Sequence, residues 1–125
     1  MAGAGPRVSR EHTVTQADTA QQVGSGELAV LATPRLVQWL EQTTFHAARQ
    51  ITEPGATSVG THVRVEHLKA TLVGAIVTCE CDEPMVDGRR LVYPVRALDD
   101  SGVVVATGEI HRHIVDTTRF LERLG

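Results

Sequence analysis

The chain has 125 residues, of which 42% are hydrophobic, so it has the size of one ordinary domain with a core of its own. Aromatic residues make up only 3% and the formal net charge is −3, which excludes a base-stacking platform and a basic surface for nucleic acid or an anionic membrane. No apolar run approaches the roughly 20 residues that span a bilayer. We expect a cytoplasmic domain that binds neither nucleic acid nor membrane.

The N-terminal segment lacks the apolar stretch of a signal peptide, so we expect residues 1–10 to be a disordered leader and residues 11–125 to form a single domain. Residues 11–15 alternate polar and β-branched side chains, which predicts a short strand. The polar residues 16–27 contain Gly-Ser-Gly and are typical of a mobile loop. These glycines lack the preceding strand and the later glycine of a dinucleotide-binding fingerprint.

A long helix is predicted from Thr33 to about Ile51. Thr33 is a good N-cap, Pro34 suits the first helical position, and Pro54-Gly55 ends the helical pattern. Apolar and small side chains recur at helical spacing and form one stripe. They are Leu36, Val37, Leu40, Thr44, Ala47, Ala48 and Ile51.

Alternating side chains predict strands after the helix, at residues 60–70, 74–82, 89–98 and 103–115. Turn signals at 86–88 and 99–102 predict hairpins, and the charged turn Asp-Gly-Arg-Arg at 87–90 could also contact phosphate. Pro94 predicts an edge position or a bulge for its strand. Asp116 is placed to cap a short C-terminal helix.

This order of elements predicts an α+β fold in which one long helix packs on an antiparallel meander. A single helix covers only one face of the sheet. The other face and the strand edges need a partner, so we expect a homodimer.

Three ionisable residues interrupt the apolar patterns. Glu41 lies at the edge of the helical stripe, where it either points into a cleft beside the sheet or forms a rim carboxylate paired with an arginine. His67 ends a core-facing row that contains Val63 and Val65, where it either bonds backbone or transfers protons near neutral pH. Arg112 lies in the apolar row of the last strand, and a buried arginine needs an anion: Glu41, a ligand phosphate or a carboxylate.

Thr33 is explained by its capping role, although its hydroxyl and the helix N-terminus form a polar spot that favours anions. The helical rise places it roughly 12 Å from Glu41 along the axis. The two side chains therefore do not bond directly, and a substrate group or a residue of a partner chain has to lie between them.

Other reactive side chains carry weaker predictions. His111 and His113 share a strand face, and His62 is a candidate to join them across the sheet, but without carboxylate ligands at a recognised spacing we expect no metal site. Cys79 and Cys81 share the face of an apolar strand and are interpreted as small core residues.

Four segments in this order resemble a hot-dog-fold thioesterase of the fluoroacetyl-CoA thioesterase family. They are ATPRLVQWLE (32–41), SVGTHVRVEH (58–67), GRRLVYPVRALDD (88–100) and GEIHRHIV (108–115). The resemblance covers roughly residues 11–122, and the order and spacing of the motifs together are more specific than any one of them.

The resemblance implies a hot-dog fold with the site at a dimer interface, catalytic roles for Thr33, Glu41 and His67, and substrate contacts for Gly60 and Arg112. Glu41 would act either as the nucleophile, through a mixed anhydride, or as a general base on water. Thr33 would orient the reacting group, and His67 would position or protonate the leaving thiolate. Backbone N–H groups near Gly60 would hold the oxyanion, while Arg112 would contact the CoA moiety or hold the glutamate.

The implied function is hydrolysis of a short acyl-CoA-type thioester to a carboxylic acid and CoA, with no cofactor beyond the CoA of the substrate and no metal. The family member that selects fluoroacetyl-CoA has an aromatic lid before the helix, whereas residues 16–32 contain no Phe, Tyr or Trp. The resemblance therefore does not extend to fluoroacetyl selectivity. The alternative is a non-catalytic acyl-CoA-binding or sensing domain; a hydratase is disfavoured because its Asp–His helix motif is missing.

Overall fold

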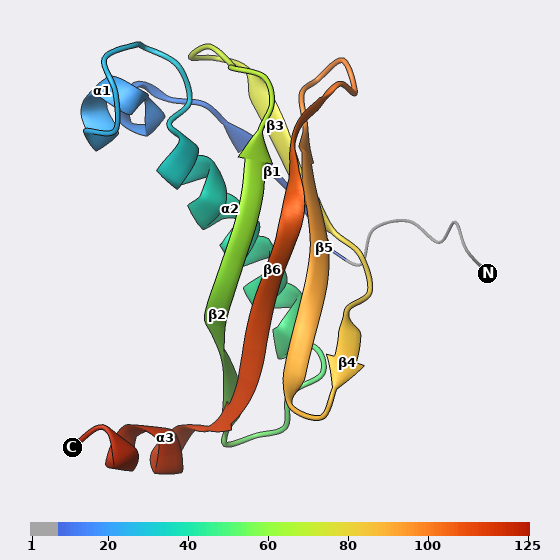
Figure 1. Cartoon of the computed structure of the whole chain (residues 1–125). Helices are drawn as coiled ribbons and strands as arrows, with labels where there is room; N and C mark the ends of the chain where they lie inside the picture. Colours follow the sequence, from blue (N-terminus) through green and yellow to red (C-terminus); the bar gives the residue numbers. More distant parts are fainter. Residues whose placement is uncertain (1–7) are drawn as a thin grey trace.

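The computed structural model describes residues 8–125, which form a six-stranded antiparallel sheet with one long helix across one face (Figure 1). The strands are β1 (Val8–Thr13), β2 (Ala56–His67), β3 (Ile76–Cys81), β4 (Met85–Asp87), β5 (Arg90–Leu98) and β6 (Val104–Asp116). The helices are η1 (Gln16–Asp18), a 3-10 turn, α1 (Ala20–Val23), α2 (Thr33–Arg49) and α3 (Thr117–Arg123). Within the described residues, none of the helices combines the length and the apolar content needed to cross a bilayer.

The sheet begins earlier in the chain than predicted. Val8 pairs with Cys81 of β3, so residues 8–10 belong to β1 and not to the predicted leader; residues 1–7 of that leader lie outside the described part of the chain. The predicted loop at 16–27 also contains η1 and α1. Gly24 ends α1 in the left-handed conformation with φ of 88°, which glycine adopts without steric cost.

The helix α2 packs on the sheet through a continuous buried stripe. The stripe consists of Leu36, Trp39, Leu40, Thr43, Thr44, Ala47 and Ala48. It contains Trp39 and Thr43, which the predicted stripe lacked, while Ile51 is exposed and lies beyond the helix end. The buried hydroxyls of Thr43 and Thr44 each donate to a helix carbonyl at 2.8 Å, so their burial leaves no unsatisfied donor.

The predicted meander is correct for β3, β5 and β6 and wrong for β2. The strand order is β1-β3-β5-β6-β2, with β4 beside β5, so β2 forms one edge of the sheet and pairs only with β6 (Figure 1). Turn residues mark the hairpins on either side of β5. The connection at 68–75 is longer and carries the chain from β2, past two other strands, to β3.

Pro94 lies in an interior strand, so the predicted edge position is wrong. In an antiparallel strand the N and O atoms of one residue point to the same neighbour. The carbonyl of Pro94 accepts from the backbone N–H of Asp82, beyond the end of β3 and before β4. The missing N–H of proline therefore faces an interruption in the neighbouring strands, where it costs no ladder bond.

Both cysteines belong to the core, as predicted. Cys79 and Cys81 are 0% exposed on the face of the sheet that α2 covers, and burial raises the pKa of the Cys79 thiol to about 12. At the far end of β6, the Asp116 carboxylate accepts a hydrogen bond of 2.9 Å from the backbone N–H of Arg119, which confirms the predicted cap of α3.

Candidate active site

Thr33 is the first residue of α2, and its hydroxyl faces the end of β2. The N-cap position belongs to Ala32, which makes no side-chain capping bond, so the predicted capping role of Thr33 is wrong. The Thr33 hydroxyl instead lies 2.7 Å from Nδ1 of His67, which comes from a strand 34 positions later in the chain. The structure thus joins two of the predicted catalytic residues through a hydrogen bond.

His67 ends β2 and is half-buried. Burial lowers the pKa of its imidazole below the ordinary value of 6.5, and the nearby backbone of Lys69 opposes this shift only in part. The ring is therefore neutral at pH 7. In one tautomer Nδ1 accepts from the Thr33 hydroxyl, and in the other it donates to it.

Glu41 lies eight residues after Thr33, against the first half of β2. A Cβ at residue 60 would overlap Oε2 of Glu41, so only glycine leaves room for the carboxylate beside this strand. The register of β2 shifts between Gly60 and His62, which is a β-bulge. The carboxylate is partly exposed, with 43% of its side chain accessible, and therefore remains reachable from solvent.

Arg112 projects from β6 toward α2 and holds the position opposite Glu41. It is only 4% exposed, and its Nη1 lies 3.6 Å from Oε2 of Glu41. Its Nε and Nη2 donate to the hydroxyl and the carbonyl of Ser58 at 2.8 and 3.1 Å, and its guanidinium lies 5.6 Å from the ring centre of Phe45. Burial lowers the pKa of Arg112 while the charge of Glu41 raises it. The predicted ion pair between a buried arginine and Glu41 is therefore present.

The predicted residues fall into two hollows within one chain. Thr33 and His67 line a groove of about 530 Å³ between the start of α2 and the end of β2. Glu41 and Arg112 line a smaller one of about 220 Å³ together with Phe45 and two glutamines. The structure places Glu41 with Arg112 and Gly60, and Thr33 with His67, in keeping with the expected separation of roughly 12 Å along the helix.

The chain matches a known protein family over most of its length. The model of the FlK family, described as fluoroacetyl-CoA-specific thioesterase, matches residues 14–118, which is most of the chain. The chain belongs to this family. The fluoroacetyl-CoA thioesterase of Streptantibioticus cattleyicolor is 35% identical over 92 residues, which make up 73% of this chain and 65% of the relative. The matched part thus spans slightly less than two thirds of that relative.

Solved structures agree with the family assignment. A variant of the fluoroacetyl-CoA-specific thioesterase FlK in complex with fluoroacetate and CoA matches with a TM-score of 0.82 and 29% identity, over 93% of this chain and 94% of that one. A Thermus thermophilus hypothetical protein of the thioesterase superfamily matches with a TM-score of 0.84 over 94% and 88% of the two chains; at 23% identity it supports the fold alone. The hot-dog fold and the family resemblance are confirmed, while the homodimer stays a prediction.

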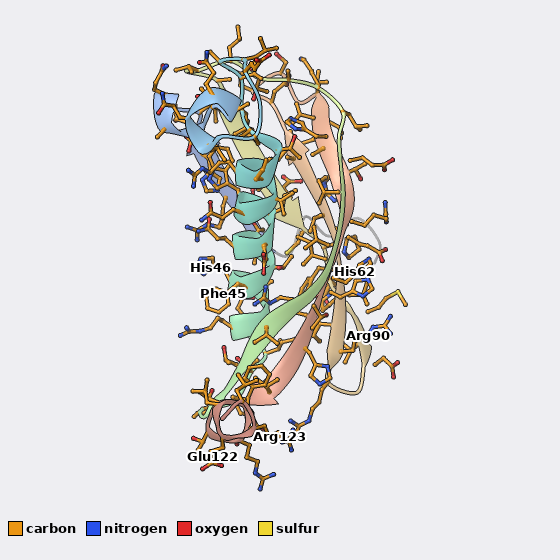
Figure 2. All side chains as sticks on the ribbon, turned by 60° about the vertical axis from the view of Figure 1, so that its left-hand side comes forward. Phe45, His46, His62, Arg90, Glu122 and Arg123 are labelled. Atoms are coloured by element: carbon orange, nitrogen blue, oxygen red, sulfur yellow. The ribbon has the colours of Figure 1, made fainter. Side chains whose placement is uncertain are left out.

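The histidines considered as metal ligands lie on the face of the sheet away from α2, where Figure 2 shows His62. The ring centres of His62 and His111 are 4.5 Å apart, and Oε2 of Glu109 lies 2.7 Å from Nε2 of His111. A carboxylate is therefore present where none was expected. Arg64 also pairs with Glu109, at 3.6 Å, so protein groups already engage this carboxylate. His113 is not part of the group, and the expectation of a metal-free protein stays a prediction.

Ser58 and Phe45 contact Arg112 in the structure, and the sequence analysis identified neither of them. The predicted strand began at residue 60, so Ser58 fell outside it. Its contact with Arg112 depends on the pairing of β2 with β6, in which Ser58 lies opposite Ile114. The only local signal was a strand pattern that extends back to residue 56.

Proposed function

We propose that this member of the family hydrolyses a short acyl-CoA thioester to a carboxylic acid and CoA, in the cytoplasm and as a homodimer. The observation that carries the proposal is the Glu41 carboxylate, which lies against Gly60 and 3.6 Å from the buried Arg112. The buried cation compensates the carboxylate and fixes its direction, and the absence of a side chain at residue 60 leaves room for the carboxylate against the strand backbone. We place the thioester carbonyl on the exposed side of this carboxylate.

Two chemical routes use this carboxylate. As a nucleophile, Glu41 attacks the thioester carbon and the C–S bond breaks to release the CoA thiolate. Water then hydrolyses the mixed anhydride to free acid and restored carboxylate, and the proton set free neutralises the thiolate. As a general base, Glu41 takes a proton from water while the water oxygen attacks the same carbon, and that proton finally neutralises the CoA thiolate. Both routes need an oxyanion site, which we assign to backbone N–H groups near Gly60.

We assign the hydrogen-bonded pair of Thr33 and His67 to the sulfur side of the thioester. The Thr33 hydroxyl orients the thioester, and the neutral His67 ring donates an N–H bond toward the departing sulfur. No cofactor beyond the CoA of the substrate takes part in this scheme, and no metal.

A homodimer unites the two hollows in one site. The edge of β2 is unpaired within the described chain, and two such edges pair antiparallel about a two-fold axis. Antiparallel pairing brings the end of β2, with His67, beside the beginning of β2 in the second copy, where Gly60 and Glu41 lie. A thioester bound between the copies then reaches the Thr33–His67 pair of one copy and Glu41 of the other. The separation of roughly 12 Å between Thr33 and Glu41 of one chain is therefore no obstacle.

The acyl group is proposed to be short and not selectively fluoroacetyl. The segment before α2 folds over the groove near Thr33, and its residues lining that groove are Ala20, Ser25, Val30 and Leu31. Small and aliphatic side chains give no aromatic cover to the acyl group, so discrimination between acetyl and fluoroacetyl groups is expected to be weak.

Release of thiol from a panel of acyl-CoAs, from acetyl through halogenated and aryl groups, tests the proposal. The wild type should cleave at least one of them, and both Glu41→Ala and Glu41→Gln should lose about 10²-fold or more of this turnover while keeping the fold and the dimer. Wild-type turnover in Glu41→Ala would remove Glu41 from the mechanism. Tight acyl-CoA binding by the wild type without any thiol release would instead establish the non-catalytic binding domain.

A further inference from the structure

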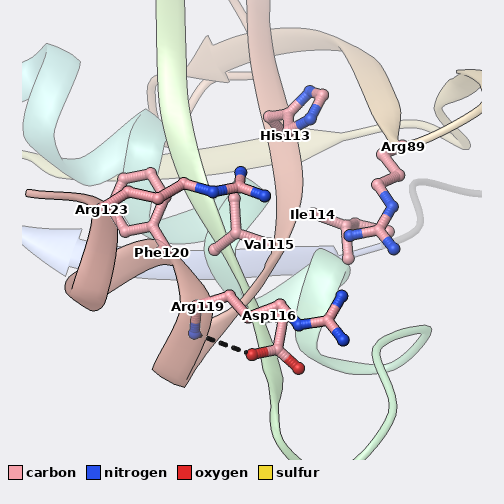
Figure 3. A pocket seen from close by; sticks show the side chains of 8 residues that line it. All are labelled: Arg89, His113, Ile114, Val115, Asp116, Arg119, Phe120 and Arg123. Atoms are coloured by element: carbon pink, nitrogen blue, oxygen red, sulfur yellow. Dashed lines mark hydrogen bonds between the residues drawn. The ribbon is translucent and has the colours of Figure 1, made fainter.

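A pocket rich in arginine lies at the end of β6, beside α3 and apart from both hollows of the candidate active site (Figure 3). It has a volume of about 410 Å³. Arg89 reaches it from the turn between β4 and β5, and Arg119 and Arg123 reach it from α3. Phe120 and Ile114 supply apolar surface between these cations.

The arginines concentrate positive charge in a chain that is acidic overall. Three of the twelve lysines and arginines line this single pocket, although the formal net charge of the chain is −3. Among residues 8–125, no carboxylate forms an ion pair with Arg89, Arg119 or Arg123. Asp116 also lines the pocket, but its carboxylate accepts from the backbone N–H of Arg119 (Figure 3). Three cations against one carboxylate leave the pocket with an excess of positive charge, which favours an anionic ligand.

We propose that this pocket binds the phosphate groups at the nucleotide end of the CoA thioester; the inference rests on the proposed hydrolase function. Guanidinium groups form paired, charge-assisted hydrogen bonds with phosphate oxygens, which suits a ligand that carries several phosphates. The ring of Phe120 and the planar guanidinium groups offer stacking surfaces for the adenine base. In this assignment Arg89, which belongs to the charged turn at residues 87–90, contacts the phosphate groups.

The position of the pocket along β6 agrees with this assignment. Arg112 lies beside Glu41, and Ile114 and Asp116, which follow it on the same face of β6, both line the pocket; His113 and Val115 line it from the opposite face. Asp116, the last residue of β6, lies about 13 Å along the strand from Arg112. An extended pantetheine arm spans such a distance, so one CoA thioester reaches from the Glu41 carboxylate to the arginines.

The first experiment compares an acyl-CoA with the same acyl group on pantetheine, which has the thioester but no nucleotide. In the double variant Arg119→Gln/Arg123→Gln, KM for the acyl-CoA should rise about threefold to tenfold, with KM for the acyl-pantetheine unchanged. The matched control is Arg90→Gln, which removes an exposed arginine adjacent to Arg89 that does not line the pocket (Figure 2). It should change neither value.

An equal rise of KM for both substrates, or no rise for either, would overturn the proposal while leaving the hydrolase function intact. The second experiment measures binding of adenosine 3′,5′-bisphosphate and of inorganic phosphate by calorimetry, and needs no turnover. The bisphosphate should bind more tightly than phosphate to the wild type and Arg90→Gln, and should lose about threefold to tenfold in affinity in the double variant. Equal affinity for the two anions would reduce the pocket to a simple anion site. If the wild type cleaves no thioester, this measurement alone decides the proposal.

Discussion

Gly60 shows how one missing side chain shapes the site. Its backbone passes so close to Glu41 that a methyl group would displace the carboxylate from its place beside Arg112. In Gly60→Ala we therefore expect thiol release to fall about tenfold to a hundredfold, because a misplaced catalytic group loses its alignment. The melting temperature should change little, since residue 60 is exposed and the carboxylate is free to move outward.

Thr61→Ala is the matched control for Gly60→Ala, because it changes the neighbouring residue of the same bulge, which is also exposed. It should keep wild-type turnover and melting temperature. Full activity in Gly60→Ala would mean that the position of Glu41 beside the strand is not needed for the reaction.

His67 makes the protein sensitive to acid. Its pKa is lowered by burial in the folded state, so the unfolded chain binds the proton more readily. The free energy of unfolding should therefore fall as the pH decreases below about 6.5, the ordinary pKa of histidine. Urea unfolding at pH 7.5 and 5.5 measures this loss, which should be smaller in His67→Gln. It should not vanish, because burial also lowers the pKa of His12 and His46. An identical loss in wild type and variant would contradict the assignment.

The contacts of some site residues could be predicted from the sequence, and those of others could not. Arg112 was predictable, because strand alternation put it among apolar side chains and burial then demanded an anion such as Glu41. Thr33 was assigned to the helix cap, and a local pattern contains nothing about His67, which lies 34 positions away and reaches it only through the tertiary fold. Ser58 was missed for the same reason, since its contact with Arg112 requires the register of β2 and β6.

The helix α2 carries Thr33 and Glu41, so its packing sets the geometry of both hollows. Leu40 is 0% exposed beneath the helix, next to Glu41 in sequence. Leu40→Ala should lower the free energy of unfolding by about 2–5 kcal/mol, since it removes buried methyl groups and leaves a cavity. Urea denaturation measures the loss. Leu28→Ala, at a position 68% exposed, should stay within about 0.5 kcal/mol of the wild type; an equal loss in both would argue against this packing.

The positions of the helices and strands along the chain were predicted better than the pairing of the strands in the sheet. Period and turn residues are local signals, and they placed α2, α3, β3, β5 and β6 to within a few residues. The pairing of β2 with β6 is not a local property, because β2 is followed by a long connection instead of a tight turn. β4 was missed because three residues are too short to establish an alternation.

The exposed edge of β2 is the surface through which we expect two copies of the chain to assemble. Val63 lies on the inner face of this edge strand and is 40% exposed in the single chain. In an antiparallel dimer about a two-fold axis, Val63→Asp places two like charges at the interface, which should dissociate the dimer. Light scattering after gel filtration should then give the 13.5 kDa of one chain. Turnover should fall with the dimer, because each site in the proposed dimer uses residues of both copies.

Arg64→Ala changes the adjacent residue, whose side chain is on the opposite face of β2, and should leave both mass and turnover as in the wild type. A monomeric wild type that still cleaves acyl-CoA would contradict the shared site. A dimeric Val63→Asp would place the interface elsewhere.

The burial of both thiols also determines what a thiol reagent detects. Cys79 and Cys81 are the only cysteines of the chain, both are fully covered, and the Cys79 thiol stays protonated far above neutral pH. While the chain is folded, a disulfide reagent therefore reports the CoA product alone, without background from the protein. On unfolding, two protein thiols become reactive per chain. One reagent thus counts catalytic turnover in the native state and the loss of that state under denaturant.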